Sequence, residues 1–359
     1  MKNSRLANFR EKLADKVDAA IIFDSANKRY LSGVNTDDAG TLVVTKNGSF
    51  FIVDSRYIEV ANRYIDSGIK VILQTELYEQ IGEIFLQNNL KTYALETQKT
   101  PISVLNRLKE KITSADFVCN LDAGDKISEL RSVKDDAELE LIKFAQKITD
   151  EAFDYILGKI SEGKTEKELA LELEFFMRLH GAEKVSFDII FVGGKNTSMP
   201  HGVPSDYKLK KGDLITIDFG ADVNGYKSDM TRTVALGHIS DEQKRVYDIV
   251  LEAQQKAIEQ AREGIACCEV DKAARNVIKS YGYGDYFGHA LGHSVGLDIH
   301  ESPNFSPKCN TILKEGMILS VEPGIYLPQK FGVRIEDLVY VTKNGSINLT
   351  KSKKSLIIL

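Results

Sequence analysis

The sequence predicts an α/β domain over residues 1–124, followed by an α+β domain over residues 125–359. Three observations predict this division. Helical and strand-like stretches alternate through the first part of the chain, a polar segment near 121–134 leads into a long charged helix, and the C-terminal part is rich in strands. A chain of 359 residues is long enough to build two hydrophobic cores.

The first domain alternates short apolar runs, typical of strands, with amphipathic helical segments. We expect strands at 19–23, 41–45, 49–54, 70–74, 92–96 and 116–120, and helices at 4–16, 26–32, from about 56, at 77–89 and after Pro101. Neither GxGxxG nor GxxxxGK[ST] occurs in this part of the chain, so the sequence predicts no phosphate-binding loop there.

The second domain begins with a helix marked by one apolar stripe, which we expect to end at Gly163. The stripe consists of Ile142, Ala145, Ile148, Ala152 and Ile156. Capping boxes at Thr165 and Ser240 predict two further helices, which reach about His180 and Gly264. A fourth helix is expected over about 269–281, and strands at 186–194 and in the C-terminal segments HSVGLDIHE, GMILSVEP and GVRIEDLVYVT.

A hairpin with two aspartates is the most specific local signal. Residues 215–233 read ITIDFGADVNGYKSDMTRT, and Asn-Gly at 224–225 between alternating apolar residues is a strong two-residue turn signal. With this turn, Asp218 lies opposite Thr231. Asp218 and Asp229 then share a face as diagonal neighbours, with backbones roughly 7–8 Å apart. Such a pair is typical either of a solvent-exposed face of the hairpin or of a site where carboxylates bind two cations. The two cations of such a site are about 3.5–4 Å apart.

Further acids and histidines cluster in the C-terminal motifs. Glu322 and Glu336 occur at or within hydrophobic strands, where a carboxylate is costly to bury unless it is paired, protonated or metal-bound. Each acid alone is also compatible with helix capping or with an ion pair to Arg334, and a single histidine is compatible with a hydrogen-bonded core residue. Four histidines lie near these motifs, namely His201, His289, His293 and His300.

The combination of one histidine with four carboxylates (Asp218, Asp229, Glu322 and Glu336) indicates a metal site. This oxygen-rich donor set suits Mn²⁺, with Co²⁺ or Zn²⁺ as alternatives. The four carboxylates carry charge −4, which two divalent ions neutralise, so we expect two metal ions.

Other functions are disfavoured by the composition. HExxH is absent, and no basic patch predicts a nucleic-acid partner at net charge −5. No apolar run approaches 18 residues, so we expect no membrane span and a cytoplasmic location. The four cysteines have no ligand spacing and are expected to be reduced and structural, namely Cys119, Cys267, Cys268 and Cys309.

The motifs resemble those of the pita-bread metallopeptidases. They are MPHG, DFGADVNGYKSDMTRT, GHSVGLDIHE, SVEPGIY and RIED, spread over about 198–337. The series is similar to the Xaa-Pro branch, aminopeptidase P and prolidase, and the segment NKRYLSGV resembles the creatinase-type N-domain of that branch. One departure is Ser294, which replaces the second glycine of the usual GHGxG.

The resemblance implies a role for each matching residue. Asp229 and Glu336 would contact both metal ions, Asp218 would bind one ion, and His293 and Glu322 would complete the other. Glu322 would also act as general base and acid at a bridging hydroxide. The resemblance further implies that His201 and His300 contact the substrate carbonyl, with His289 and Arg334 in supporting positions. We add that the Thr231 hydroxyl is placed to steady a carboxylate.

The activity implied is cleavage of the Xaa-Pro bond at the N-terminus of short peptides, by an enzyme that is usually a homodimer. The resemblance leaves open whether the enzyme is an aminopeptidase or a dipeptidase. A methionine aminopeptidase-like enzyme is one alternative. Creatinase works without this ligand set, and non-catalytic pita-bread binding modules lose ligands or add charged tails, whereas this chain does neither.

Overall fold

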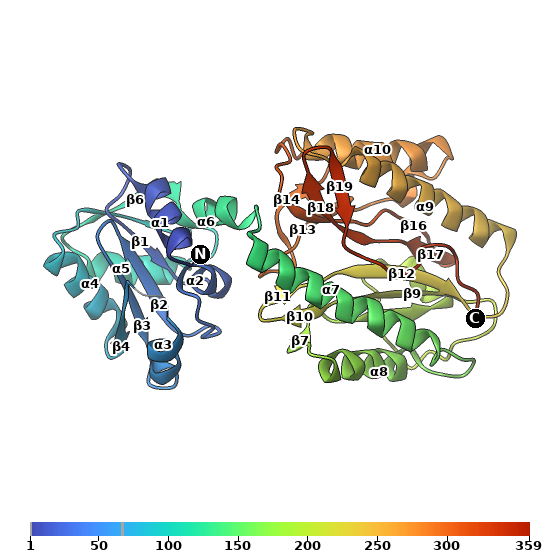
Figure 1. Ribbon diagram of the computed structural model, residues 1–359, viewed down its shortest axis with the longest axis horizontal. Coiled ribbons are helices and arrows are strands. Elements are labelled where there is room, and N and C mark those ends of the chain that lie inside the picture. The colour runs from blue at the N-terminus through green and yellow to red at the C-terminus, as the bar shows by residue number, and fades with distance from the viewer. Residues whose placement is uncertain (1, 66–67) are drawn as a thin grey trace. The chain divides into compact units, whose positions relative to one another are not determined.

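The computed structural model describes residues 2–65 and 68–359. The chain forms two compact units, residues 1–131 and 132–359 (Figure 1). The boundary predicted after residue 124 lies in the first turn of helix α6 (Ala123–Arg131), before this division. No helix in the described part of the chain is long and apolar enough to cross a membrane.

The first unit is built on one mixed six-stranded sheet with the order β4-β3-β2-β1-β5-β6. Strand β1 pairs antiparallel with β2 and parallel with β5, so the alternating α/β pattern predicted from the sequence is confirmed. The strands are β1 (Ala19–Ile22), β2 (Thr41–Thr45), β3 (Ser49–Val53), β4 (Ile69–Leu73), β5 (Thr92–Leu95) and β6 (Asp116–Asp122). The helices that accompany α6 are α1 (Lys2–Leu13), α2 (Ser25–Ser32), α3 (Ile58–Tyr64), α4 (Leu77–Gln87) and α5 (Ile102–Lys111).

Helices α4 and α5 bury their apolar faces against this sheet. Ile81 and Phe85 from α4 and Leu108 from α5 pack in one core with Ile21 and Tyr93 from the strands. Burial of each such side chain stabilises the unit by roughly 1.5–3 kcal/mol.

Four long helices frame the second unit. They are α7 (Asp136–Leu157), α8 (Glu166–Leu179), α9 (Asp241–Gln260) and α10 (Cys267–Ser280). The capping boxes predicted at Thr165 and Ser240 are present, and a third at Asp135 opens α7. The predicted end of α7 at Gly163 was wrong, because the helix ends at Leu157, where the Gly158 backbone N–H turns back to Tyr155 O at 3.2 Å. Gly163 lies in the following loop, and its N–H donates to Leu209 O at 2.9 Å.

The strands of the second unit form several small sheets (Figure 1). One has the order β12-β9-β8, one β11-β10-β7, one β14-β13-β15-β18-β19, and β16 pairs with β17. Their bounds are β7 (Lys184–Val185), β8 (Ile190–Gly193), β9 (Leu214–Phe219), β10 (Ala221–Val223), β11 (Tyr226–Lys227), β12 (Met230–Ala235), β13 (Gly292–Ser294), β14 (Glu301–Phe305), β15 (Ile318–Val321), β16 (Gly324–Leu327), β17 (Phe331–Arg334), β18 (Asp337–Thr342) and β19 (Gly345–Asn348). Two short 3₁₀ helices are η1 (Gly194–Ser198) and η2 (Gly284–Tyr286).

The continuous strand predicted over 186–194 was wrong. Within this segment only residues 190–193 form a strand, β8, and the preceding strand β7 belongs to a different sheet. The Ser186 hydroxyl lies 2.8 Å from both Ala221 O and Ser228 O, and its bonds hold the chain against the hairpin instead of a neighbouring strand. The interruption places residues 187–190 in the wall of the cleft described below.

Two cores hold the second unit together. Helices α7 and α8 pack on strands β8, β9 and β12 through residues such as Ile148, Leu173 and Ile217. Helices α9 and α10 pack on β15, β17 and β18 through residues such as Val250 and Leu319.

Candidate metal centre

A cleft of about 860 Å³ in the second unit gathers the predicted site residues. All nine of them line it, although they come from distant segments of the chain. They are His201, Asp218, Asp229, His289, His293, His300, Glu322, Arg334 and Glu336.

The hairpin has the register predicted from its Asn-Gly turn. Val223 pairs with Tyr226 next to the turn, and Asp218 pairs with Thr231 further along. Gly220 has no room for a side chain, because a Cβ there would lie 1.9 Å from Ser228 O. This close backbone approach explains the glycine after Asp-Phe, and it holds together the two strands that carry the aspartates.

The remaining acids and the histidine come from the sheet that contains β13, β15 and β18. His293 is the central residue of β13, Glu322 follows β15, and Glu336 precedes β18. The Ser320 hydroxyl accepts from the His293 backbone N–H at 3.0 Å and donates to Glu322 Oε1 at 3.1 Å. A Cβ at Gly292 would lie 2.0 Å from Ser320 O, so glycine is needed where β13 meets β15.

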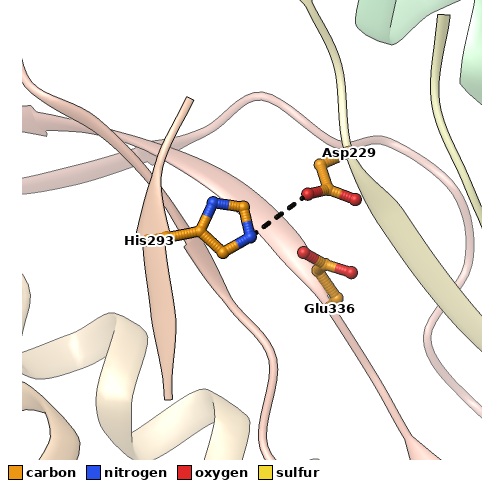
Figure 2. A group of neighbouring side chains, drawn as sticks. All are labelled: Asp229, His293 and Glu336. Carbon is orange, nitrogen blue, oxygen red and sulfur yellow. Dashed lines mark ion pairs between the residues drawn. The ribbon is translucent and has the colours of Figure 1, made fainter. Parts of the chain in front are cut away.

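The side chains of Asp229 and Glu336 lie beside the ring of His293 (Figure 2). His293 Nε2 lies 3.5 Å from Asp229 Oδ2 and 3.3 Å from Glu322 Oε1. Asp229, His293 and Glu336 each offer a ligand atom, and these atoms lie within 4.8 Å of one another. The arrangement is therefore compact enough for one cation to contact all three residues.

Arg334 and Thr231 each hold one oxygen of an acid and leave the other oxygen without a partner. Arg334 Nη2 lies 2.6 Å from Asp218 Oδ2, and the Thr231 hydroxyl donates to Glu336 Oε2 at 2.7 Å. Asp218 Oδ1 and Glu336 Oε1 are buried and accept no hydrogen bond. Buried carboxylate oxygens without partners are unfavourable, and a bound cation would satisfy both.

Burial and mutual repulsion disfavour the charged forms of the acids. Burial, followed by the charges of Asp218 and Glu322, raises the pKa of Asp229 well above its usual value. Burial and the charge of Asp229 do the same to the pKa of Glu336. Burial, assisted by Asp218, raises the pKa of Glu322 to about 8. Divalent cations would remove this repulsion and keep the carboxylates ionised.

Burial favours the neutral forms of three histidines of the cleft, His289, His293 and His300. Burial lowers the pKa of His293 to about 4, helped by His300, whose ring centroid lies 4.4 Å away. Burial likewise lowers the pKa of His289 to about 4, and burial followed by the charge of His201 lowers the pKa of His300. A neutral imidazole is the form that binds a metal ion or accepts a proton.

Two supporting residues were missed by the sequence reasoning. The Tyr326 hydroxyl contacts both His289 Nε2 and Arg334 Nη1 at 2.9 Å, and Ser320 links His293 to Glu322 as described above. Both lie inside the motif SVEPGIY, but nothing in the sequence pattern indicated which partners they reach. The predicted role of the Thr231 hydroxyl, to steady a carboxylate, is confirmed by its bond to Glu336.

Ser294, the departure from the usual glycine, is accommodated without disturbing His293. Its hydroxyl donates to Ile318 O at 2.9 Å and lies 3.2 Å from Lys134 Nζ, which also forms a buried ion pair with Glu301. The serine therefore joins β13 to β15 and to the segment that leads into α7.

The residues present fit divalent cations. One neutral imidazole and four carboxylates form a hard donor set, and two of their buried oxygens have no partner. Aligned with known families, residues 140–343 match the metallopeptidase family M24 and residues 5–133 match the creatinase/prolidase N-terminal domain. The chain belongs to metallopeptidase family M24.

Individual M24 relatives extend over the whole chain. The Xaa-Pro dipeptidase of Pyrococcus horikoshii is 39% identical over 357 residues, which cover 99% of this chain and 98% of that protein. The solved structure of an Xaa-Pro dipeptidase from Bacillus anthracis is 37% identical, with a TM-score of 0.96 and full coverage of both chains. That of an X-Pro aminopeptidase from Thermotoga maritima is also 37% identical, with a TM-score of 0.90 and 98% and 99% coverage.

These comparisons confirm the predicted fold class and the predicted resemblance. The first unit is a creatinase-type N-domain and the second is a pita-bread M24 domain, and the protein is a metallopeptidase. The relatives include both dipeptidases and an aminopeptidase. The peptide length that this chain prefers therefore has to be inferred from the residues of its own cleft.

Proposed function

We propose that this protein is a dinuclear, metal-dependent exopeptidase that cleaves the Xaa-Pro bond at the N-terminus of short peptides. The observation that carries the proposal is the convergence of four carboxylates and a neutral histidine in one cleft of an M24 chain. Its similarity over the full chain to Xaa-Pro dipeptidases supports the choice of substrate.

The proposed ligands are Asp218, Asp229, His293, Glu322 and Glu336, which would hold two divalent ions. Mn²⁺ suits this oxygen-rich set, and Co²⁺ and Zn²⁺ are the alternatives. Bound ions of this kind lower the pKa of water and polarise a scissile carbonyl.

In this proposal the residues of the chain orient the peptide and move the proton. Glu322 accepts the proton of the attacking water and returns it to the proline nitrogen, which leaves as a secondary amine. His201 and His300 contact the substrate carbonyl from the rim of the cleft. Arg334 keeps Asp218 in place, and Tyr326 links Arg334 to His289.

The test is an assay of protein that has been stripped with chelator and reloaded with Mn²⁺. Ala-Pro, Ala-Pro-Ala and Met-Ala-Ser are offered in parallel, with the Asp218→Ala and His293→Ala variants beside the wild type. We expect metal-dependent cleavage after alanine at the Ala-Pro bond, and loss of activity in both variants. Release of methionine alone would move the protein to the methionine aminopeptidase branch, and folded protein without activity on any of the three peptides would contradict the proposal.

The same proposal includes a homodimer in the cytoplasm, as expected from the sequence. Sedimentation equilibrium of the full chain tests the first part, because a dimer has twice the 40.0 kDa mass of the chain. Cell fractionation with activity and immunodetection tests the second.

A further inference from the structure

The loop over residues 194–205, here named the His201 loop, forms one wall of the cleft. Its residues Pro200, His201, Gly202, Val203 and Pro204 line the cleft. Apart from the short helix η1 at its start, the loop has no regular secondary structure. Besides backbone bonds such as Gly202 N to Met199 O, its position depends on side chains from elsewhere in the fold.

Glu166, the first residue of α8, holds both ends of this loop. Its Oε1 accepts from Gly193 N at 2.8 Å and from Asn196 Nδ2 at 2.9 Å, where the loop begins. Its Oε2 accepts from Ser205 N at 2.8 Å and from Ser205 Oγ at 2.6 Å, where the loop ends. One carboxylate thus joins two points of the chain on either side of His201.

This carboxylate is not needed to cap its own helix. Thr165 and Glu168 already form the capping box of α8, and the Glu166 backbone N–H donates to Tyr207 O. Glu166 is completely buried. A buried carboxylate is expensive unless its lone pairs are filled, and here four donors fill them beside the positive end of a helix dipole.

The opposite side of the loop is held by strand β17, which pairs with β16. Arg334 Nη1 donates to Pro200 O at 3.2 Å, and the Gly332 backbone N–H donates to Thr197 Oγ1 at 2.8 Å. A Cβ at Gly202 would lie 2.9 Å from a methyl carbon of Val192, so the loop also packs closely on β8. Release of the Glu166 bonds would loosen the ends of the loop, which then keep only backbone bonds such as that from Lys167 N to Ser205 O, while these inner contacts remain.

We propose that Glu166 is a positioning residue that fixes the His201 loop and thereby sets the place of His201 against the substrate carbonyl. This inference rests on the proposed function. It assigns to a buried carboxylate, remote from the metal ligands in sequence, a measurable share of the catalytic rate.

The first test compares Glu166→Gln with Glu96→Gln. Glu96 is a matched control, because it is 1% exposed and accepts from Phe23 N, Asp24 N and Asn27 Nδ2 at 2.7–2.9 Å, all within the first unit. In each variant the NH₂ group of the glutamine replaces a carboxylate oxygen and faces the hydrogen-bond donors that the oxygen accepted from. We expect Glu166→Gln to lower kcat/KM for the cleaved peptide by about tenfold to a hundredfold, the scale of a small misplacement of a catalytic group. Glu96→Gln should lower the Tm but leave kcat/KM within about twofold.

The second test is a double-mutant cycle with His201→Ala, which separates positioning from general destabilisation. If Glu166 acts through His201, Glu166→Gln has little further effect on kcat/KM once His201 is alanine. Additive losses would overturn the inference, as would a Glu166→Gln enzyme within twofold of wild type or an equal loss in Glu96→Gln.

A milder variant keeps the inference falsifiable if Glu166→Gln fails to fold. Asn196→Ala removes one donor to Oε1, and we expect kcat/KM to fall about threefold, with the fall again absent in the His201→Ala background. A wild-type enzyme inactive on Ala-Pro and Ala-Pro-Ala would instead be a failure of the proposed function, which the wild-type assay detects before any variant is made.

Discussion

Arg334 and Asp218 form a buried ion pair in which Nη2 lies 2.6 Å from Oδ2, while Oδ1 of the same carboxylate has no partner. Burial opposes the charge of Arg334, but Tyr326 and Asp218 outweigh it and raise the pKa of Arg334 well above its usual value. The pair therefore keeps one oxygen of Asp218 engaged with a permanent cation and presents the other to the cleft. Because one oxygen is held by Arg334, the Asp218 carboxylate is oriented before a metal ion binds to the other oxygen.

Arg334→Lys tests this orientation. A lysine carries the charge but lacks the planar fork that reaches Asp218, Thr231 and Tyr326 at the same time. We expect metal affinity to fall by about 10- to 100-fold, measured by competition with a chelator of known affinity. The exposed Arg245→Lys is the control and should bind metal as the wild type does. Unchanged affinity in Arg334→Lys would show that the ion pair does not orient Asp218.

Thr231→Val removes a hydroxyl while it keeps the shape of the side chain. The hydroxyl donates to Glu336 Oε2 and accepts from Arg334 Nε at 3.0 Å, so both partners lose a buried bond. We expect kcat/KM to fall by about tenfold or more, with weaker metal binding. Thr231→Ser retains the hydroxyl and should restore most of the activity. If Thr231→Ser and Thr231→Val lose the same activity, the contribution of Thr231 comes from packing and not from its hydrogen bond.

The hairpin and the predicted ligands were accessible from the sequence because each depends on local pattern. The Asn-Gly turn determines the register of the strands, so the pairing of Asp218 with Thr231 followed by counting. The acids in hydrophobic strands were conspicuous because unpaired charges are rarely buried. The resemblance then identified which histidine accompanies them.

The errors and omissions arise where contacts between distant segments override local pattern. The run at 186–194 is apolar enough for one strand, but the bonds of the Ser186 hydroxyl to the hairpin interrupt it. The partners of Glu166 lie 27 to 39 residues further along the chain, and no periodicity indicates them. Tyr326 was missed for the same reason, because its contact with His289 joins residues 37 apart.

The stability of the metal-free protein should fall as the pH rises from 6.5 to 8. Burial raises the pKa of Glu322 to about 8, so the folded protein retains a proton there that the unfolded chain loses near its ordinary value of about 4.3. The stability due to this group is present at low pH and is lost as the pH rises through 8, by up to about 1.4 kcal/mol per pH unit. His289 and His293, with pKa values of about 4, lower stability only below about pH 6.5, where the unfolded chain gains protons.

Urea denaturation at pH 6.5 and pH 8 measures this difference. With chelator present, we expect a lower midpoint at pH 8, and addition of Mn²⁺ should reverse the loss because the ions favour the ionised acids. Glu322→Gln should show a smaller difference between the two pH values. Equal midpoints at both pH values in the metal-free wild type would contradict the raised pKa.

The peptide carboxylate should contribute little to recognition. Among the described residues that line the cleft, Arg334 is the single lysine or arginine, and its guanidinium is engaged by Asp218, Thr231, Tyr326 and Pro200. A charge-assisted hydrogen bond to a substrate carboxylate is worth about 1.5–3 kcal/mol, or at least tenfold in kcat/KM. We therefore expect Ala-Pro amide to be cleaved within about threefold of the kcat/KM of Ala-Pro, and Ala-Pro-Ala to be cleaved as well. A loss of tenfold or more on amidation, repeated with Leu-Pro and its amide, would show that a cation outside this set of lining residues binds the carboxylate and that the enzyme is built for dipeptides.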